Sequence, residues 1–386
     1  MSLQVKLYLP GVSCLERNAG PIILLEPVWF LQKEPVGHTT STITRNKGES
    51  IVSDIIVLAH GDGGALTHKL VQEIFLDCFK SEHLNNLTDA ATLSFWGDGE
   101  VVVSTDSFVV SPMFFPGGDI GKLSVCGTVN DIAVSGGIPQ YLTAAFILEE
   151  GLLLSQLKRV VKSMVEAARE AGVEIIAGDT KVVEKGHGDK IFINTTGIGY
   201  KLKGKLPGYH KISPGDKIII NGTVGDHGLT IMNLRQDLGI EGNLTSDCAS
   251  LNRLIKKVLH RFDGIRIMRD PTRGGLATTL KELAKFTNCN FIIYEDRVPV
   301  KEEVGSTAEM LGLDPLYLAN EGKFISIIEK DQAEEFVEVL RKNPLGKKAE
   351  IIGEVKEGEG KVLLKTFFGG TKSLNYMTGA PLPRIC

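Results

Sequence analysis

The 386-residue chain is long enough for two domains of ordinary size, and 42% of its residues are hydrophobic, which is enough for real cores. A net charge of −4 gives no overall electrostatic reason to bind nucleic acid or an anionic membrane. The six cysteines show no CxxC spacing, and no apolar stretch approaches a membrane span, so we expect a reduced, cytoplasmic protein without a zinc site or disulfide framework.

Residues 1–51 mix Gly, Pro, Ser and Thr with little periodicity. We interpret them as an N-terminal extension, either a gene start set too far upstream or a poorly ordered addition. A regular α/β pattern begins at residue 52, and the first domain is predicted over 52–205. Its first elements are a short strand at Ile55–Leu58, a glycine turn and an amphipathic helix at Leu66–Phe79.

The rest of the first domain alternates strands with helices. Its clearest helix is Gln156–Ala171, with Ser155 placed to cap it and Gly172 beyond its end. The other predicted elements are a helix at Gly121–Ser135 and strands at Glu100–Val110, Tyr141–Leu148, Glu174–Ala177 and Lys190–Thr196.

Gly, Pro and Lys predict a linker at Lys201–Gly215, where no apolar period is sustained. A second α/β domain is predicted over 206–370, so the fold class is layered α/β in two domains. Its predicted elements are helices at Leu229–Asp237, after Gly275 and at Gln332–Lys342, and strands at Lys217–Asn221, at Asn290–Tyr294, near Ile351 and near Val362.

Residues 371–386 are predicted to form a mobile tail, because their Gly and Pro residues do not propagate a helix or a sheet ladder. The tail carries Cys386 at its end. Many terminal residues are merely frayed, and a lone Cys is usually an inert small hydrophobe. A thiol on a movable arm is also suited to carry a chemical group, which is our interpretation.

Five short segments place an acidic residue beside Gly, Thr or Asn, and we read them as turns at strand or helix ends. Glycine lets the backbone approach a phosphate, and carboxylates hold Mg²⁺, so together they predict a magnesium–nucleotide site. Neither a Walker A motif nor a GxGxxG after a strand is present. The segments are Thr88–Ala91, Ser104–Asp106, Gly127–Asp131, Gly178–Lys181 and Gly225–Gly228.

Several motifs, in order from about Ile55 to Cys386, resemble the HypE family of hydrogenase maturation factors, the carbamoyl dehydratases. That family belongs to the superfamily of aminoimidazole ribonucleotide synthetase, selenophosphate synthetase and thiamine-monophosphate kinase. The motifs are GTVND from Gly127, GDTKVV from Gly178, GDHG from Gly225, RDPTRGG from Arg269, NEGK from Asn320 and the terminal PRIC from Pro383.

The resemblance implies that a partner carbamoyltransferase loads Cys386 with a carbamoyl group, which ATP-dependent dehydration converts to a thiocyanate. An amide oxygen is a poor leaving group, so phosphorylation by ATP and a base at the nitrogen make chemical sense. The cyano group would pass to an iron-binding maturation scaffold. The family is also homodimeric, with the first domains of two subunits closing a shared barrel near the nucleotide.

The resemblance also implies roles for individual residues. Catalysis would use Cys386 as the tethered substrate, Lys181 against the phosphoryl charge, and Glu321 as the base, with His227 as the second candidate. A buried structural role is an equal alternative for His227, and a structural ion pair is one for Asp270 and Arg273. Mg²⁺ would be held by Asp89, Asp106 and Asp131. ATP would be contacted by Gly61, Gly63, Gly64, Thr128, Asn130, Asp131, Gly178, Asp179 and Thr180.

Two other functions stay open from the sequence. One is a different enzyme of the superfamily, such as a selenophosphate synthetase, although the glycine loop holds Asp62 where that chemistry needs a reactive Cys. The other is a thiol carrier without catalytic activity, in which the tail docks partners and the Asp/Gly segments are structural.

Overall fold

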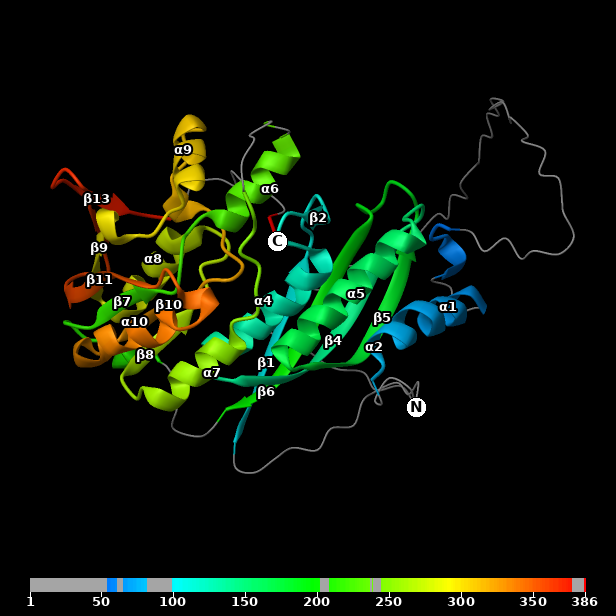
Figure 1. Cartoon of the computed structure of the whole chain (residues 1–386), viewed down its shortest axis with the longest axis horizontal. Coiled ribbons are helices and arrows are strands. Elements are labelled where there is room, and N and C mark those ends of the chain that lie inside the picture. The colour runs from blue at the N-terminus through cyan, green and yellow to red at the C-terminus, as the bar shows by residue number, and fades with distance from the viewer. Residues whose placement is uncertain are drawn as a thin grey trace, which may run out of the picture. The chain divides into compact units, whose positions relative to one another are not determined.

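The computed structural model describes residues 54–60, 65–81, 99–201, 208–236, 238, 244–376 and 385–386. The predicted extension at 1–51 and the centre of the predicted linker, residues 202–207, lie outside them. Two α/β halves follow one another along the described chain (Figure 1), which confirms the predicted layered α/β class. None of the described helices combines the length and the apolar composition that a membrane crossing requires.

The first half is built on a four-stranded sheet with the order β1-β6-β4-β5. β4 pairs antiparallel with β6 and parallel with β5, and β1 pairs antiparallel with β6. The elements of this half are α1 (Ala65–Leu70), a π-helical turn (Val71–Leu76), α2 (Asp77–Phe79), β1 (Glu100–Phe108), β2 (Phe114–Phe115), β3 (Gly118–Asp119), α4 (Ile120–Val134), β4 (Ile138–Glu149), α5 (Leu154–Ala171), β5 (Glu174–Val183) and β6 (Ile191–Lys201).

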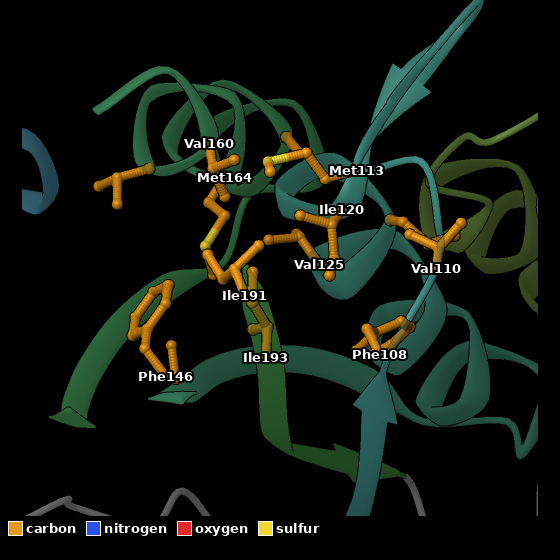
Figure 2. Close-up of a cluster of buried hydrophobic side chains, with 14 of the residues drawn as sticks. Phe108, Val110, Met113, Ile120, Val125, Phe146, Val160, Met164, Ile191 and Ile193 are labelled. Atoms are coloured by element: carbon orange, nitrogen blue, oxygen red, sulfur yellow. The ribbon is translucent and has the colours of Figure 1, made fainter. Parts of the chain in front are cut away.

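Helices α4 and α5 cover one face of this sheet, and their side chains fill the core between them. Figure 2 shows Val160 and Met164 of α5 above Ile191 and Ile193 of β6, with Val125 of α4 beside them. The alternating burial of β6 follows from its period of two, because only every second side chain points toward the helices. The other face carries exposed Val101, Val103 and Ile147.

The second half is a seven-stranded mixed sheet between two layers of helices, with the order β13-β12-β9-β11-β7-β10-β8. Ile218 and Ile220 of β7 pack with α8, whereas Ile219 between them packs with α7 and α10. The elements are β7 (Lys217–Ile220), α6 (Asp226–Gln236), α7 (Asn252–Arg261), β8 (Ile265–Arg269), α8 (Gly275–Thr287), β9 (Cys289–Tyr294), α9 (Glu302–Met310), β10 (Ile325–Ile328), α10 (Ala333–Arg341), β11 (Glu350–Glu357), β12 (Val362–Lys365) and β13 (Thr371–Leu374), with short 3₁₀ turns at Tyr209–Lys211, Glu295–Arg297, Pro315–Tyr317, Lys330–Gln332 and Pro344–Gly346. A further 3₁₀ turn, Leu58–His60, precedes α1 in the first half.

Two details at the element ends differ from the prediction. Helix α5 begins one residue before Ser155, so Ser155 lies in its first turn and makes no capping bond, while Gly172 ends the helix in the left-handed conformation as predicted. Thr371–Leu374, which the sequence assigned to the tail, pair with β12 and bury Leu374. The first quarter of the predicted tail therefore belongs to the sheet.

Three of the five predicted turns are regular structure. Ser104–Asp106 lies inside strand β1, Gly127–Asp131 inside helix α4, and Gly178–Lys181 inside strand β5. In the last two segments the glycine explains the error, because it allows a close approach within an element and not a turn. A Cβ on Gly127 would lie 2.9 Å from the Phe108 ring, and one on Gly178 would lie 2.8 Å from the Ala144 carbonyl oxygen.

Helix α4 is buried on nearly all sides, since it packs against the first sheet, α5, α7 and β8. Its polar side chains therefore need partners inside the protein. Thr128 pairs with Thr195 of β6 at 2.6 Å. Asn130 accepts from the Leu251 N–H at 2.8 Å and donates to the Ala249 carbonyl oxygen at 3.0 Å, which ties α4 to the segment before α7.

The Asn130 bonds generate a stability prediction. Asn130→Ala leaves a buried N–H and a buried carbonyl without their partners, so we expect the free energy of unfolding to fall by about 2–4 kcal/mol. Denaturant unfolding followed by circular dichroism measures it. Asn194→Ala, on the partly open face of β6, is the matched control and should cost less than about 1 kcal/mol. Equal losses in the two variants would contradict this account of α4.

Candidate active site

A cavity of about 360 Å³ lies where β1 and α4 meet the segment between β8 and α8. Its lining includes Asp106 of β1, Asp131 of α4, Asp270 and Arg273 before α8, and Glu321 and Cys386. With Glu282 of α8, five carboxyl groups and one thiol from distant parts of the chain thus face one space.

Local structure fixes the walls of this cavity. Asp106 lies near the end of β1, and Ser104 on the same strand donates to Oδ2 of Asp131 at 2.7 Å. Gly275 at the start of α8 has φ +62°, and a Cβ there would lie 2.6 Å from two carbonyl oxygens, of Leu316 and Leu318. Only glycine fits this position, so the turn that carries Asp270 and Arg273 depends on it.

The cavity is strongly acidic for a buried site. Burial, then the charges of Asp270 and Asp106, raise the pKa of Asp131 to about 7. Burial also raises the pKa values of Asp106 and Asp270. Arg269 also lines the cavity, but it forms an ion pair with Glu282 at 3.1 Å, so its charge is shared with that fifth carboxyl group. Three like-charged carboxyl groups that destabilise one another are a donor set suited to a hard cation.

The carboxyl groups of Asp106, Asp131 and Asp270 fit magnesium only as a partial set. Within the described residues, no three His, Cys, Asp or Glu side chains are gathered closely enough to bind a metal ion on their own. Mg²⁺ commonly takes one or two carboxylates and completes its shell with water and phosphate oxygens. The predicted ligand Asp89 and the predicted loop residues Gly61, Gly63 and Gly64 lie outside the described residues.

Glu321 is the most perturbed acid of the cavity. Burial, then the negative charges of Asp247, Asp270 and Asp106, raise its pKa well above the usual range. Its Oε1 atom has no hydrogen-bond partner among the described residues. An unpartnered buried carboxyl group costs stability and is uncommon, so it marks a position where a substrate donor would complete the bonding.

Ile385 and Cys386 are docked in this structure. The Ile385 side chain is buried in the core of the first half, and its carbonyl oxygen lies 2.7 Å from Nε2 of His227. The Val109 N–H donates to the Cys386 carbonyl oxygen at 3.0 Å. These contacts place the Cys386 sulfur in the cavity near Glu321.

His227 is buried at the start of α6 with both ring nitrogens engaged. Because a carbonyl oxygen only accepts, Nε2 must carry the proton, and Nδ1 accepts from the Ser246 hydroxyl at 2.8 Å. Burial lowers the pKa of His227 and favours this neutral form. The geometry matches the structural alternative for His227, since the ring binds the main chain of Ile385.

The docked thiol is a poor thiolate. Burial, then the charge of Glu321, raises the pKa of Cys386 to about 12, and the opposing charge of Arg273 does not compensate. The cavity therefore favours a neutral sulfur, as in a thiol or a carbamoylated cysteine.

The remaining predicted site residues lie away from this cavity in the described chain. The Thr128 and Asn130 side chains are used inside the protein, as described above. Gly178, Asp179, Thr180 and Lys181 lie on β5, at the opposite sheet edge from β1. Lys181 is 66% exposed and pairs with Asp179 at 2.9 Å, which also lowers the pKa of Asp179.

Sequence reasoning assigned no role to Ser246 and Asp247, which contact His227 and the Glu321 backbone. The only available signal was a Ser-Asp-Cys run in a polar stretch, and such runs are common in loops. Asp270 and Arg273 were named within a motif, and the structure brings both to the cavity.

Comparison with known families agrees with this architecture. The family model of the AIR synthase related protein N-terminal domain matches residues 87–200, and that of the corresponding C-terminal domain matches residues 213–365. The two matches coincide with the two α/β halves and leave the predicted linker between them. The fold is therefore the two-domain α/β fold of AIR synthase related proteins.

Individual relatives match most of this chain and nearly all of their own length. The carbamoyl dehydratase HypE of Cupriavidus necator is 46% identical over 87% of this chain and 96% of the relative. A crystal structure of the hydrogenase maturation protein HypE in complex with ATP has a TM-score of 0.82 and 49% identity, covering 86% of this chain and 99% of that one. The structure of a HypE–HypF complex matches with a TM-score of 0.70 and 47% identity, over 81% and 100%. The chain belongs to the HypE family of carbamoyl dehydratases.

Proposed function

We propose that this protein converts an S-carbamoyl group on its own Cys386 into a thiocyanate at the expense of ATP. The observation that carries the proposal is the docking of the Cys386 sulfur in the same cavity as Glu321, a buried carboxyl group without a partner. The relatives named carbamoyl dehydratase, and the ATP bound to a related structure, support the same reaction.

The reaction removes the elements of water from S–C(=O)–NH₂. Phosphorylation by ATP makes the oxygen a good leaving group, which departs attached to phosphate, while the nitrogen gives up both its protons. Glu321 is the base for a nitrogen proton, because its raised pKa makes its ionised form a stronger acceptor than an ordinary carboxylate. The amide N–H groups also supply the donors that Oε1 of Glu321 lacks.

Asp106, Asp131 and Asp270 would hold Mg²⁺ together with phosphate oxygens. When bound there, the ion would offset the charge that builds up on the transferred phosphoryl group. Arg273 faces the same space, so it would contact either the phosphate or the carbamoyl oxygen. The cavity contains no side chain that must act as a nucleophile, because the substrate is already attached to the chain.

His227 and Val109 hold the substrate arm through its main chain. Their bonds to the carbonyl oxygens of Ile385 and Cys386 fix the sulfur relative to Glu321 without touching the carbamoyl group. We therefore propose a positioning role for His227 and the role of base for Glu321 alone.

The partners follow from the same chemistry. A related HypE forms a complex with HypF, and we propose that a carbamoyltransferase of that kind loads Cys386. An iron-binding maturation scaffold would accept the cyano group for a hydrogenase iron centre. A reducing cytoplasm suits such a carrier, and Cys386 and the other described cysteines are free thiols.

We further propose a homodimer in which Lys181 serves the cavity of the other subunit. Within one subunit β5 lies three strands away from β1, about 14 Å across the sheet. The sheet face between them carries Val101 and Val103, which are 52% and 60% exposed. Exposed apolar side chains on a sheet face favour pairing with a second copy.

The role of Glu321 gives the first functional prediction. Glu321→Gln keeps the shape but removes the base, so we expect the dehydration of carbamoylated Cys386 to slow by about 10²- to 10⁴-fold. Intact-mass analysis after addition of ATP detects the reaction as loss of one water from the carbamoylated chain. The exposed Glu335→Gln, which breaks only the ion pair with Arg261 and does not line the cavity, is the control. A Glu321→Gln protein that dehydrates at the wild-type rate would refute the assignment.

The dimer proposal is tested by complementation. In isolated mixed dimers of Lys181→Ala and Glu321→Gln subunits, one of the two cavities combines an intact Glu321 with the partner subunit's Lys181. We expect such dimers to recover about half of the wild-type activity, whereas each homodimer stays inactive. Mixed dimers as inactive as the homodimers would show that Lys181 does not serve the other subunit.

The raised pKa of Cys386 predicts how docking depends on pH. The docked position favours the protonated thiol. The stability of docking is therefore complete below the ordinary thiol pKa of about 8.5 and is lost as the pH rises toward about 12. Near neutral pH, iodoacetamide should alkylate Cys386 at least about tenfold more slowly than a peptide of residues 381–386. His227→Ala, which removes the anchor of Ile385, should approach the peptide rate. Equal rates for wild type and peptide would contradict the docked thiol.

A further inference from the structure

The segment Ser246–Cys248, just before α7, contacts the two groups that define the proposed reaction geometry. Oδ1 of Asp247 accepts the Glu321 N–H at 3.2 Å, and Oδ2 accepts the Gly322 N–H at 3.0 Å. Oδ2 also accepts from the Lys323 ammonium at 2.9 Å. One carboxylate therefore binds three consecutive residues of the loop that carries Glu321.

The loop is held from its other side as well. The Glu321 carbonyl oxygen accepts from Asn130 of α4 at 3.4 Å and from the Ala249 N–H at 3.5 Å. Gly322 packs so closely on the Asp247 carbonyl that no Cβ would fit. The backbone of Glu321 is thus fixed, while its carboxyl group reaches the cavity without a partner at Oε1.

The same segment fixes the arm that carries the sulfur. Ser246 donates to Nδ1 of His227, and Nε2 of His227 donates to the carbonyl oxygen of Ile385. Asp247 is hydrogen-bonded to Glu321, and the neighbouring Ser246 is connected to Ile385 through His227. This shared segment sets the distance between the carboxyl group and the sulfur of Cys386.

The charge of Asp247 is retained inside the protein. Although burial opposes ionisation, Lys323 lowers the pKa of Asp247 below its usual range. Lys323 also approaches Asp226, which pairs with Lys301 at 3.1 Å and accepts from Thr223 at 2.7 Å. Asp247 is therefore an anion beneath the Glu321 loop, with Lys323 as its counterion.

We propose that Asp247 is the positioning residue of this site: its carboxylate holds the Glu321–Lys323 loop so that the Glu321 carboxyl group meets the group carried by Cys386. The role rests on the proposed function and deepens it, because Asp247 itself touches neither the sulfur nor the cavity. A purely structural carboxylate would stabilise the loop without affecting the ionisation of Glu321.

Asp216 provides a matched control for this distinction. It is as buried as Asp247, accepts a backbone N–H from Ser213 at 2.9 Å and pairs with Arg266 at 3.2 Å. It lies at the start of β7 and not among the cavity-lining residues. Asp216→Asn should cost stability through the same kinds of bonds without changing the reaction.

The test uses single-turnover dehydration of the carbamoylated protein. Asp247→Asn is expected to slow the reaction about 10- to 100-fold at saturating ATP, with the KM for ATP unchanged. Asp216→Asn is expected to lower the melting temperature while keeping the wild-type rate. An Asp247→Asn protein with the wild-type rate would overturn the proposal.

The pH dependence separates positioning from simple loss of structure. Glu321 is faced by Asp247, by Asp106 from β1, Cys126 from α4 and Asp270 before α8, and by Cys386. Asp247→Asn removes a negative charge, so the acid limb of the rate profile should move to lower pH. Lys323→Gln removes the counterion, so the limb should move to higher pH. Shifts of the same sign in both variants would overturn the proposal.

An infrared titration of the Glu321 carboxyl group, identified by comparison with Glu321→Gln, measures the same two shifts without activity. A wild-type protein that fails to dehydrate its carbamoylated Cys386 would refute the proposed function. Opposite carboxyl shifts in Asp247→Asn and Lys323→Gln would still support the electrostatic coupling of Asp247 to Glu321. Unchanged Glu321 titration in both variants would refute that coupling even in an active protein.

Discussion

The burial of α4 is the constraint on which the rest of this structure depends. Every residue of the helix except Lys122 and Asp131 is buried, so the helix has no solvent face on which to place its polar groups. Thr128 and Asn130 must then find partners in β6 and in the segment before α7, and this need joins the first half to the second. Asp131 is the exception that faces the cavity. The site lies where the few polar side chains of this mostly apolar, enclosed helix reach its neighbours.

The sequence predicted the helices and strands better than the surroundings of the candidate site residues. Period-two and helical patterns located α5, β6 and β9 to within a few residues, because those signals are local. GTVND and GDTK were misread as turns, because Gly127 and Gly178 serve close packing inside a helix and a strand, and only the neighbouring Phe108 and Ala144 reveal this. The contacts of Asp247 and Ser246 join residues tens of positions apart. No local pattern encodes such distances, so these two residues had no visible role before the fold was known.

Several acidic side chains of the cavity have no positively charged partner. Burial, and after it the charges of neighbouring carboxyl groups, raise the pKa values of Asp131, Asp270 and Glu321. The nearby ammonium of Lys323 is bound to Asp247 beneath the loop. The folded state would be more stable if these acids were paired or replaced with apolar residues. Because these acids are unpaired, the cavity lowers the stability of the folded protein. Binding of a cation, and of a substrate with hydrogen-bond donors, would be favourable for the same reason. Functional sites commonly reduce protein stability in this way.

The raised pKa of Cys386 also determines where the thiol can react. A thiolate attacks a carbamoyl donor, but burial in the cavity raises the pKa of Cys386 to about 12 and so disfavours a thiolate there. Under the proposed function, an unloaded cysteine would therefore react poorly inside the cavity and would become nucleophilic after leaving it. A carbamoylated sulfur has no proton to lose, so the acidic walls do not oppose its return. Under the proposed function, the acidic walls would therefore admit the carbamoylated arm more readily than the free thiolate, which would separate loading from dehydration in space.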